Sequence, residues 1–114
     1  MTKQKILQLL GLATRARMTI SGEEMTVNEV RKGKAKLVIL SEDASDNTSK
    51  KLQDKCKSYG VDLHVFGSRF ELGHAIGKEE RVVIAITDKG FAKKITSLYE
   101  EINRGRADDQ NSST

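Results

Sequence analysis

Apolar residues recur with a helical period in five segments of this chain, and each segment predicts a helix with one buried face. The apolar positions are Ile6, Leu7, Leu9, Leu10 and Ala13; Val27 and Val30; Leu52, Cys56 and Tyr59; Leu72, Ala75 and Ile76; and Phe91, Ile95, Leu98 and Ile102. Between these helices lie shorter segments with the pattern of β-strands.

Two of the shorter segments, 37–40 and 82–86, are continuously apolar and predict strands that are buried on both faces. Residues 61–65 alternate apolar and polar side chains, as in a half-buried strand with His64 facing outward, and residues 18–20 form a short extended piece. Helices that alternate with short strands predict an α/β fold: a three-layer α/β/α sandwich with a central mixed, mostly four-stranded sheet.

Two helix starts are predicted to carry a capping box, in which a serine is followed three residues later by a glutamate. The pairs are Ser21 with Glu24 and Ser68 with Glu71. Gly60 is predicted to end the helix that precedes it.

The periodic pattern fills residues 1–103, which we expect to form a single domain, while the polar residues 104–114 are expected to form a disordered tail. No apolar run reaches the roughly 18 residues of a membrane span, so no membrane association is expected. The one cysteine, Cys56, cannot form an internal disulfide and lies on a helix's apolar stripe, which favours a buried structural thiol in a reducing cytoplasm.

Residues that could carry catalysis or hold a metal are few and scattered. The two histidines, His64 and His74, have no cysteine or carboxylate at ligand spacing. Residues 73–79 resemble a phosphate-binding loop only superficially, because Glu79 stands where a Ser or Thr would bind magnesium. We therefore expect no enzymatic activity, no metal and no cofactor.

The net charge of +4 is unevenly distributed along the chain. Residues 1–36 carry a net charge of +5, from eight Lys or Arg against three Glu, whereas residues 37–114 carry a net charge of −1. Residues 31–36 hold four cations where a helix gives way to a strand, either as a solvated turn or as a rim that contacts phosphates. The asymmetry favours a polyanionic partner. With only five aromatic residues, a stacking platform for bases is not expected.

Three blocks of sequence resemble the kink-turn-binding ribosomal protein family, which has the pelota-type RNA-binding fold. They are residues 21–38, residues 41–44 directly after a buried strand, and residues 68–77 before the last strand. Their order and spacing match the family across residues 4–102. Residues 10–17 are most similar to the small bacterial YlxQ-type members.

The resemblance implies a bacterial, cytoplasmic RNA-binding protein that acts on the ribosome or on an mRNA leader. The helix after Gly22 would enter the major groove at tandem sheared G·A pairs and read guanine edges, and the loop 77–81 would cover an extruded nucleotide. A helix N-terminus suits this role, because it offers free amides and positive potential. Since no apolar stripe is left unexplained, we expect a monomer.

The family's base-reading residues after this glycine are Asn, Glu and Lys. An alignment without a gap places Glu24, Met25 and Asn28 at these positions. A one-residue gap places Glu23 and Glu24 at the first two and Val27 at the third. The lysine is absent in both alignments.

The resemblance gives specific roles to five residues: Gly22 as the turn, Lys32 as a phosphate contact, Ser45 beside the extruded nucleotide, Arg69 as a basic contact, and Lys78 at the start of the loop. Charge adds the other cations of residues 31–36. The full predicted RNA-binding set is Gly22, Glu23, Glu24, Met25, Asn28, Arg31, Lys32, Lys34, Lys36, Ser45, Arg69, Lys78, Glu79 and Arg81.

Two other interpretations stay open at this point. The absent Asn-Glu-Lys set favours a protein-interaction module on the same fold, without direct RNA contact. A small nucleotide-binding or hydrolytic α/β domain is the third interpretation, and it rests on fold analogy alone.

Overall fold

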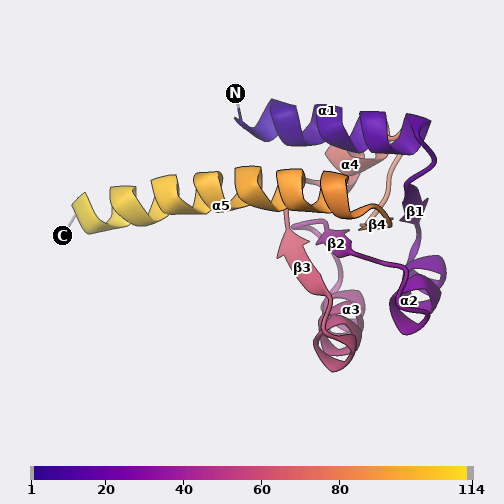
Figure 1. Ribbon diagram of the computed structural model, residues 1–114. Coiled ribbons are helices and arrows are strands. Elements are labelled where there is room, and N and C mark those ends of the chain that lie inside the picture. The colour runs from indigo at the N-terminus through magenta and orange to yellow at the C-terminus, as the bar shows by residue number, and fades with distance from the viewer. Residues whose placement is uncertain (1, 113–114) are drawn as a thin grey trace.

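The computed structural model describes residues 2–112, and their side chains through residue 104 (Figure 1). Within this range five helices alternate with four strands along the chain, as predicted. In order, the elements are α1 (Thr2–Arg15), β1 (Thr19–Ser21), α2 (Glu23–Arg31), β2 (Leu37–Leu40), α3 (Asp46–Tyr59), β3 (Asp62–Val65), α4 (Arg69–Ala75), β4 (Val83–Ile86) and α5 (Lys89–Ser112).

The four strands form one mixed sheet in the order β1-β4-β2-β3. β2 runs parallel to β3, and β4 runs antiparallel to both β1 and β2. The two continuously apolar segments form the central strands β2 and β4, and every residue of both strands is buried. Such runs need helices on both faces of the sheet.

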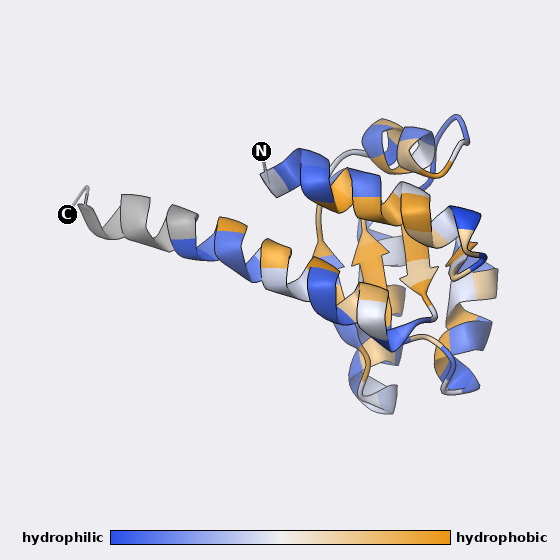
Figure 2. Cartoon of the chain, turned by 45° about the horizontal axis from the view of Figure 1, so that its top comes forward, coloured by the Kyte–Doolittle hydropathy of each residue, from blue (hydrophilic) through white to orange (hydrophobic). Residues whose placement is uncertain are grey.

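The helices α1, α4 and α5 cover one face of the sheet, and α2 and α3 cover the other (Figure 1). The pleat of β2 divides its side chains between the two cores. Leu37 and Ile39 pack with the first group of helices, and Val38 and Leu40 pack with the second. Figure 2 shows the apolar strands lying among helices that carry both hydrophilic and hydrophobic residues. The predicted three-layer sandwich is confirmed.

One of the two predicted capping boxes is confirmed and the other is wrong. The Glu71 amide donates to Ser68 Oγ at 3.1 Å, and the Ser68 amide donates to the Glu71 carboxylate at 2.9 Å. Ser21 instead pairs with Ile84 in the sheet, and α2 begins after Gly22 without a side-chain cap. Gly22 turns the chain with a φ of +100°, which glycine adopts freely, so the helix starts one residue later than the box requires.

The edge strand β3 is covered on one face by α5. His64, predicted to face outward, is half-buried on that face, where its ring stacks on Tyr99 with 4.2 Å between centroids. Desolvation lowers the pKa of His64. Val65, predicted to face inward, is 39% exposed. These two predictions are wrong, because helices pack on both faces of β3: His64 lies against α5, while Leu63 on the other face packs with the cluster that includes Leu52 of α3.

Cys56 is buried, as predicted, and desolvation raises the pKa of its thiol to about 11. Gly60 ends α3 in a left-handed conformation, as predicted. No helix in the described part of the chain is long and apolar enough to cross a membrane. The disordered tail stays a prediction: α5 extends to Ser112, while residues 113–114 and the side chains beyond residue 104 lie outside the described part.

Candidate nucleic-acid interface

The predicted site residues divide between two opposite edges of the sheet. The strands β1, β2 and β3 end at the edge where β4 begins, because Leu40 pairs with both Val65 and Val83. We call this the pocket edge. At the other edge, which we call the basic edge, β2 begins beside the ends of β4 and α2. The basic edge is defined by the side chains of Arg17, Arg31, Lys32, Lys34 and Lys36.

A pocket of about 380 Å³ opens at the pocket edge, where α2, α3 and α4 begin and the segment before β4 passes. Five predicted residues line it: Gly22, Glu23, Ser45, Arg69 and Arg81. They come from four segments that are far apart in the sequence. The sheet topology therefore gathers a site that no single stretch of the chain contains.

One wall of the pocket is the N-terminal end of α2. The Gly22 amide donates to the Val83 carbonyl at 3.1 Å, which anchors the turn to β4. Among the described side chains none caps the helix, so its first amides keep their hydrogen-bonding capacity and positive potential. Glu23 is half-buried and lines the pocket, whereas Glu24 and Met25 are exposed.

Arg69 links three of the segments that build the pocket. Its amide donates to the Asp43 carboxylate at 3.1 Å, and its Nη2 donates to the Asp43 carbonyl at 2.7 Å. Its Nη1 lies 3.8 Å from Glu80 Oε1. Arg69 is thus a structural link as well as a charge, because two acidic residues partly neutralise it.

Arg81 spans from the segment before β4 to β1. Its Nε donates to the Ser21 hydroxyl at 3.0 Å, and its Nη1 donates to the Glu80 carbonyl at 2.6 Å. Both acceptors are neutral, and no carboxylate among the side chains of residues 2–104 forms an ion pair with Arg81. Arg81 therefore presents its full positive charge to the pocket.

The loop 77–81 is fixed to α4 by a close backbone approach. A Cβ added at Gly73 would lie 2.5 Å from Cα of Glu80, so only glycine fits at this position. Lys78 and Glu79, both predicted site residues, are exposed in the loop and do not line the pocket.

The other predicted residues lie away from the pocket. Asn28 is exposed on α2. Arg31 is the last residue of α2 and Lys32, Lys34 and Lys36 follow it, whereas Gly22 precedes the helix, whose nine residues span about 13 Å. The structure therefore does not bring these four cations together with Gly22.

Three polar residues at the pocket, Asp43, Thr48 and Glu80, were not predicted to be site residues, and neither were the lining residues Val82 and Val83. Asp43 belongs to the block at residues 41–44, but its contact with Arg69 spans 26 residues of sequence and has no local signal. Thr48 donates its amide to Ser45 Oγ at 3.2 Å, and a capping serine three residues earlier could have indicated its position.

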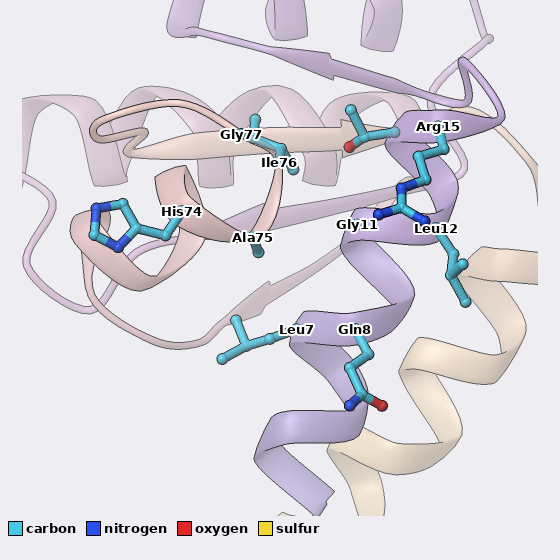
Figure 3. Close-up of a pocket in the computed structure, with 10 residues that line it drawn as sticks. Leu7, Gln8, Gly11, Leu12, Arg15, His74, Ala75, Ile76 and Gly77 are labelled. Atoms are coloured by element: carbon cyan, nitrogen blue, oxygen red, sulfur yellow. The ribbon is translucent and has the colours of Figure 1, made fainter.

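A different hollow, of about 770 Å³, lies between α1 and the segment 74–77 (Figure 3). Leu7 and Leu12 of α1 line it together with Ala75 and Ile76. A Cβ added at Gly11 would lie 3.0 Å from the Ala75 carbonyl oxygen, so this glycine permits the close approach of α1. None of the predicted RNA-binding set lines this hollow.

Comparison with known proteins identifies the family of this chain. Residues 4–96 match the sequence model of the ribosomal protein L7Ae/L30e/S12e/Gadd45 family. The chain belongs to this family. The resemblance seen in the three sequence blocks is thereby confirmed.

Relatives in this family are similar over most of their length. RNA-binding protein YlxQ of Bacillus subtilis is 55% identical over 92 residues, which cover 81% of this chain and 92% of that protein. Large ribosomal subunit protein eL30 of Spodoptera frugiperda is 34% identical over 101 residues, which cover 87% of this chain and 89% of that protein. Both names describe RNA-binding or ribosomal proteins, in agreement with the prediction of a non-enzymatic protein.

Solved structures support the same fold. A protein of unknown function from Bacillus halodurans is 53% identical and superimposes with a TM-score of 0.83, covering 84% of this chain and 97% of that one. The 15.5 kD RNA binding protein of Giardia lamblia is 22% identical, has a TM-score of 0.75, and covers 90% of this chain and 88% of its own. The latter likeness concerns the fold alone.

Proposed function

We propose that this protein binds RNA and that its pocket edge recognises a kink-turn. The observation that carries the proposal is the convergence of Gly22, Glu23, Ser45, Arg69 and Arg81 on one pocket. Family membership and the printed name of the YlxQ relative support RNA binding. An uncapped helix start beside two guanidinium groups suits a sharply folded phosphate backbone.

In this proposal the start of α2 enters the major groove that tandem sheared G·A pairs widen. The ionised Glu23 side chain only accepts hydrogen bonds, so its partner is an N–H group on a guanine edge. The amides of the first helical turn bind a phosphate or a base acceptor. Arg81 supplies positive charge in this pocket, where the family's lysine is absent.

The loop 77–81 and Ser45 would enclose an extruded nucleotide on the other side of the pocket. Gly73 and Arg69 hold this loop against α4 before RNA binds, which lowers the entropy cost of ordering it in the complex. The name of the eL30 relative supports a ribosomal target, so we propose a kink-turn in ribosomal RNA or an mRNA leader, bound by a monomer.

The direct test compares a kink-turn RNA with the same RNA in which Watson–Crick pairs replace the G·A pairs. Fluorescence anisotropy should show at least about tenfold tighter binding to the kink-turn, equivalent to about 1.4 kcal/mol. Equal affinity for the two RNAs would contradict kink-turn recognition. Binding to neither would contradict RNA binding and favour the protein-interaction alternative.

A matched pair of variants tests the role of Glu23. Glu23→Gln keeps the shape of the side chain but removes the charged acceptor, and it should reduce kink-turn affinity about tenfold. Glu24→Gln makes the same change at the exposed neighbour and should leave the affinity within about twofold. Equal losses for both variants would indicate a charge effect and not base recognition.

A further inference from the structure

The basic edge holds five exposed cations in two segments, residue 17 and residues 31–36. Arg17, Lys34 and Lys36 line a shallow hollow of about 380 Å³ with one acidic residue, Glu29. Among the side chains of residues 2–104, none of the five cations forms an ion pair. The described part of the chain therefore concentrates charge here without neutralising it.

The backbone holds two of these cations in defined turns. Arg17 adopts a φ of +61° after α1, and its neighbour Met18 donates an amide to the Ala13 carbonyl at 2.8 Å. Helices usually place glycine at this left-handed position, because a side chain is strained there. Lys36 Nζ donates to the Gly33 carbonyl at 3.1 Å. An arginine at a position where glycine would fold more easily favours a use for its charge.

The position of the basic edge separates it from the pocket. α2 runs between the two edges, and its nine residues put about 13 Å between them. A nucleotide held by Gly22 and Glu23 is therefore not the one whose phosphate contacts Lys34 and Lys36; these lysines reach phosphates further along the same RNA or on a second RNA. The exposed cations require a further stretch of polyanion or a separate one.

We propose that the basic edge is a second RNA-contacting surface, which binds the phosphate backbone of an RNA duplex outside the pocket. Lys and Arg at turns contact phosphates without reading bases, and nothing in this hollow offers an aromatic ring for stacking. With both edges occupied, one protein molecule bridges two RNA segments. The choice of RNA as the polyanion rests on the proposed function, whereas the surface itself does not.

The test uses a perfectly paired RNA hairpin that contains no G·A pairs, with binding measured by fluorescence anisotropy from low to moderate salt. Lys34→Gln combined with Lys36→Gln should weaken binding at low salt. It should also reduce the slope of log affinity against log salt by about 1.8, because each duplex phosphate contact contributes about 0.9 to that slope. A control variant, Lys5→Gln with Lys50→Gln, removes the same charge from exposed positions on α1 and α3 and should change the slope little.

Equal slopes for the two double variants would overturn the proposal, since charge alone would then explain binding. Equally tight binding to a DNA duplex of the same sequence would overturn the assignment to RNA. The double variant should lose less affinity for a minimal kink-turn RNA than Glu23→Gln does, because its two substitutions lie outside the pocket. If the wild type fails to bind the kink-turn, but the hairpin still depends on Lys34 and Lys36, the pocket proposal fails and the basic edge stands.

Discussion

The two edges of the sheet arrange their charged side chains in opposite ways. At the pocket edge, Arg69 lies close to Asp43 and Glu80, and Arg81 is held by neutral groups, so positive and negative charges nearly balance. At the basic edge three of the five cations, Arg17, Lys34 and Lys36, line a hollow with a single acid, Glu29. A balanced, closely packed site gains specificity from geometry, whereas an unbalanced surface gains salt-dependent affinity. Total charge is therefore a poor guide to where bases are read.

The geometry of the pocket edge depends most on Gly73. Gly73→Ala would force the added Cβ into the backbone of Glu80, so either the loop 77–81 moves or the fold loses roughly 1–3 kcal/mol. Kink-turn binding should fall sharply, while hairpin binding through the basic edge should persist. Urea unfolding and anisotropy measure the two effects.

The matched control for this substitution is Gly60→Ala. Position 60 has a φ of +68°, and an added Cβ there would meet nothing within 4 Å, so the variant adds backbone strain without a collision. It should lose about 1 kcal/mol of stability and keep kink-turn binding. If both variants lose kink-turn binding equally, the close approach of the loop to α4 does not shape the pocket.

Arg81 and Arg69 both lie at the pocket edge, but among the side chains that the structure describes only Arg69 has acidic partners. Arg81→Gln should reduce kink-turn affinity about tenfold and flatten its salt dependence by about one unit, because the full charge of Arg81 is available to a phosphate. Arg69→Gln should change the slope less, because Asp43 and Glu80 already neutralise much of its charge. Anisotropy over a salt series gives both slopes. A larger slope change for Arg69→Gln would refute this division of roles.

At the basic edge, replacing Arg17 should change the stability of the fold and the affinity for RNA in opposite directions. Arg17→Gly relieves the left-handed strain and should stabilise the fold by about 1 kcal/mol, which corresponds to about 4 °C in Tm. The same variant should weaken binding to the RNA hairpin. Thermal unfolding and anisotropy check the two signs, and a fall in both quantities would show that Arg17 serves the fold and not the RNA.

Lowering the pH should weaken the cap of α4, which begins at the pocket edge, before it changes the charge of the basic edge. Hydrogen bonds from Lys3 and from the Ser68 amide hold the pKa of Glu71 below its ordinary value of 4.5. A carboxyl with a lowered folded pKa contributes stability above its unfolded pKa, and that contribution is lost as the pH falls through the folded pKa. The wild type should thus be more stable than Glu71→Gln at about pH 6, and this difference should shrink by about pH 3. Urea unfolding at both pH values measures it, and a constant difference would contradict the capping role.

The fold was predictable where local patterns decide the structure. The continuously apolar runs of residues 37–40 and 82–86 predicted the two central strands, because every side chain of a strand between two helix layers is buried. The Ser68–Glu71 box was predictable for the same reason, since all of its hydrogen bonds lie within one turn. Ser21 was mispredicted because its pairing with Ile84 overrides its capping potential.

The candidate site was less predictable, because it is built from contacts that are distant in sequence. The link from Arg69 to Asp43 and the hydrogen bond from Arg81 to Ser21 both depend on the sheet order. Charge density singled out residues 31–36, yet the strand directions place them at the edge opposite Gly22. Sequence therefore identified most of the charged residues but not which of them act together.

Amide chemical-shift mapping by NMR tests the central claim most directly, using the full chain titrated with a minimal kink-turn RNA. We expect the largest shifts at Gly22, Glu23, Ser45 and Arg81, which surround the pocket, and small shifts at residues 31–36. Extending one RNA helix should then add shifts at residues 31–36 without removing the first set. Shifts confined to residues 31–36, with the amides of Gly22 and Glu23 unchanged, would contradict recognition at the pocket edge.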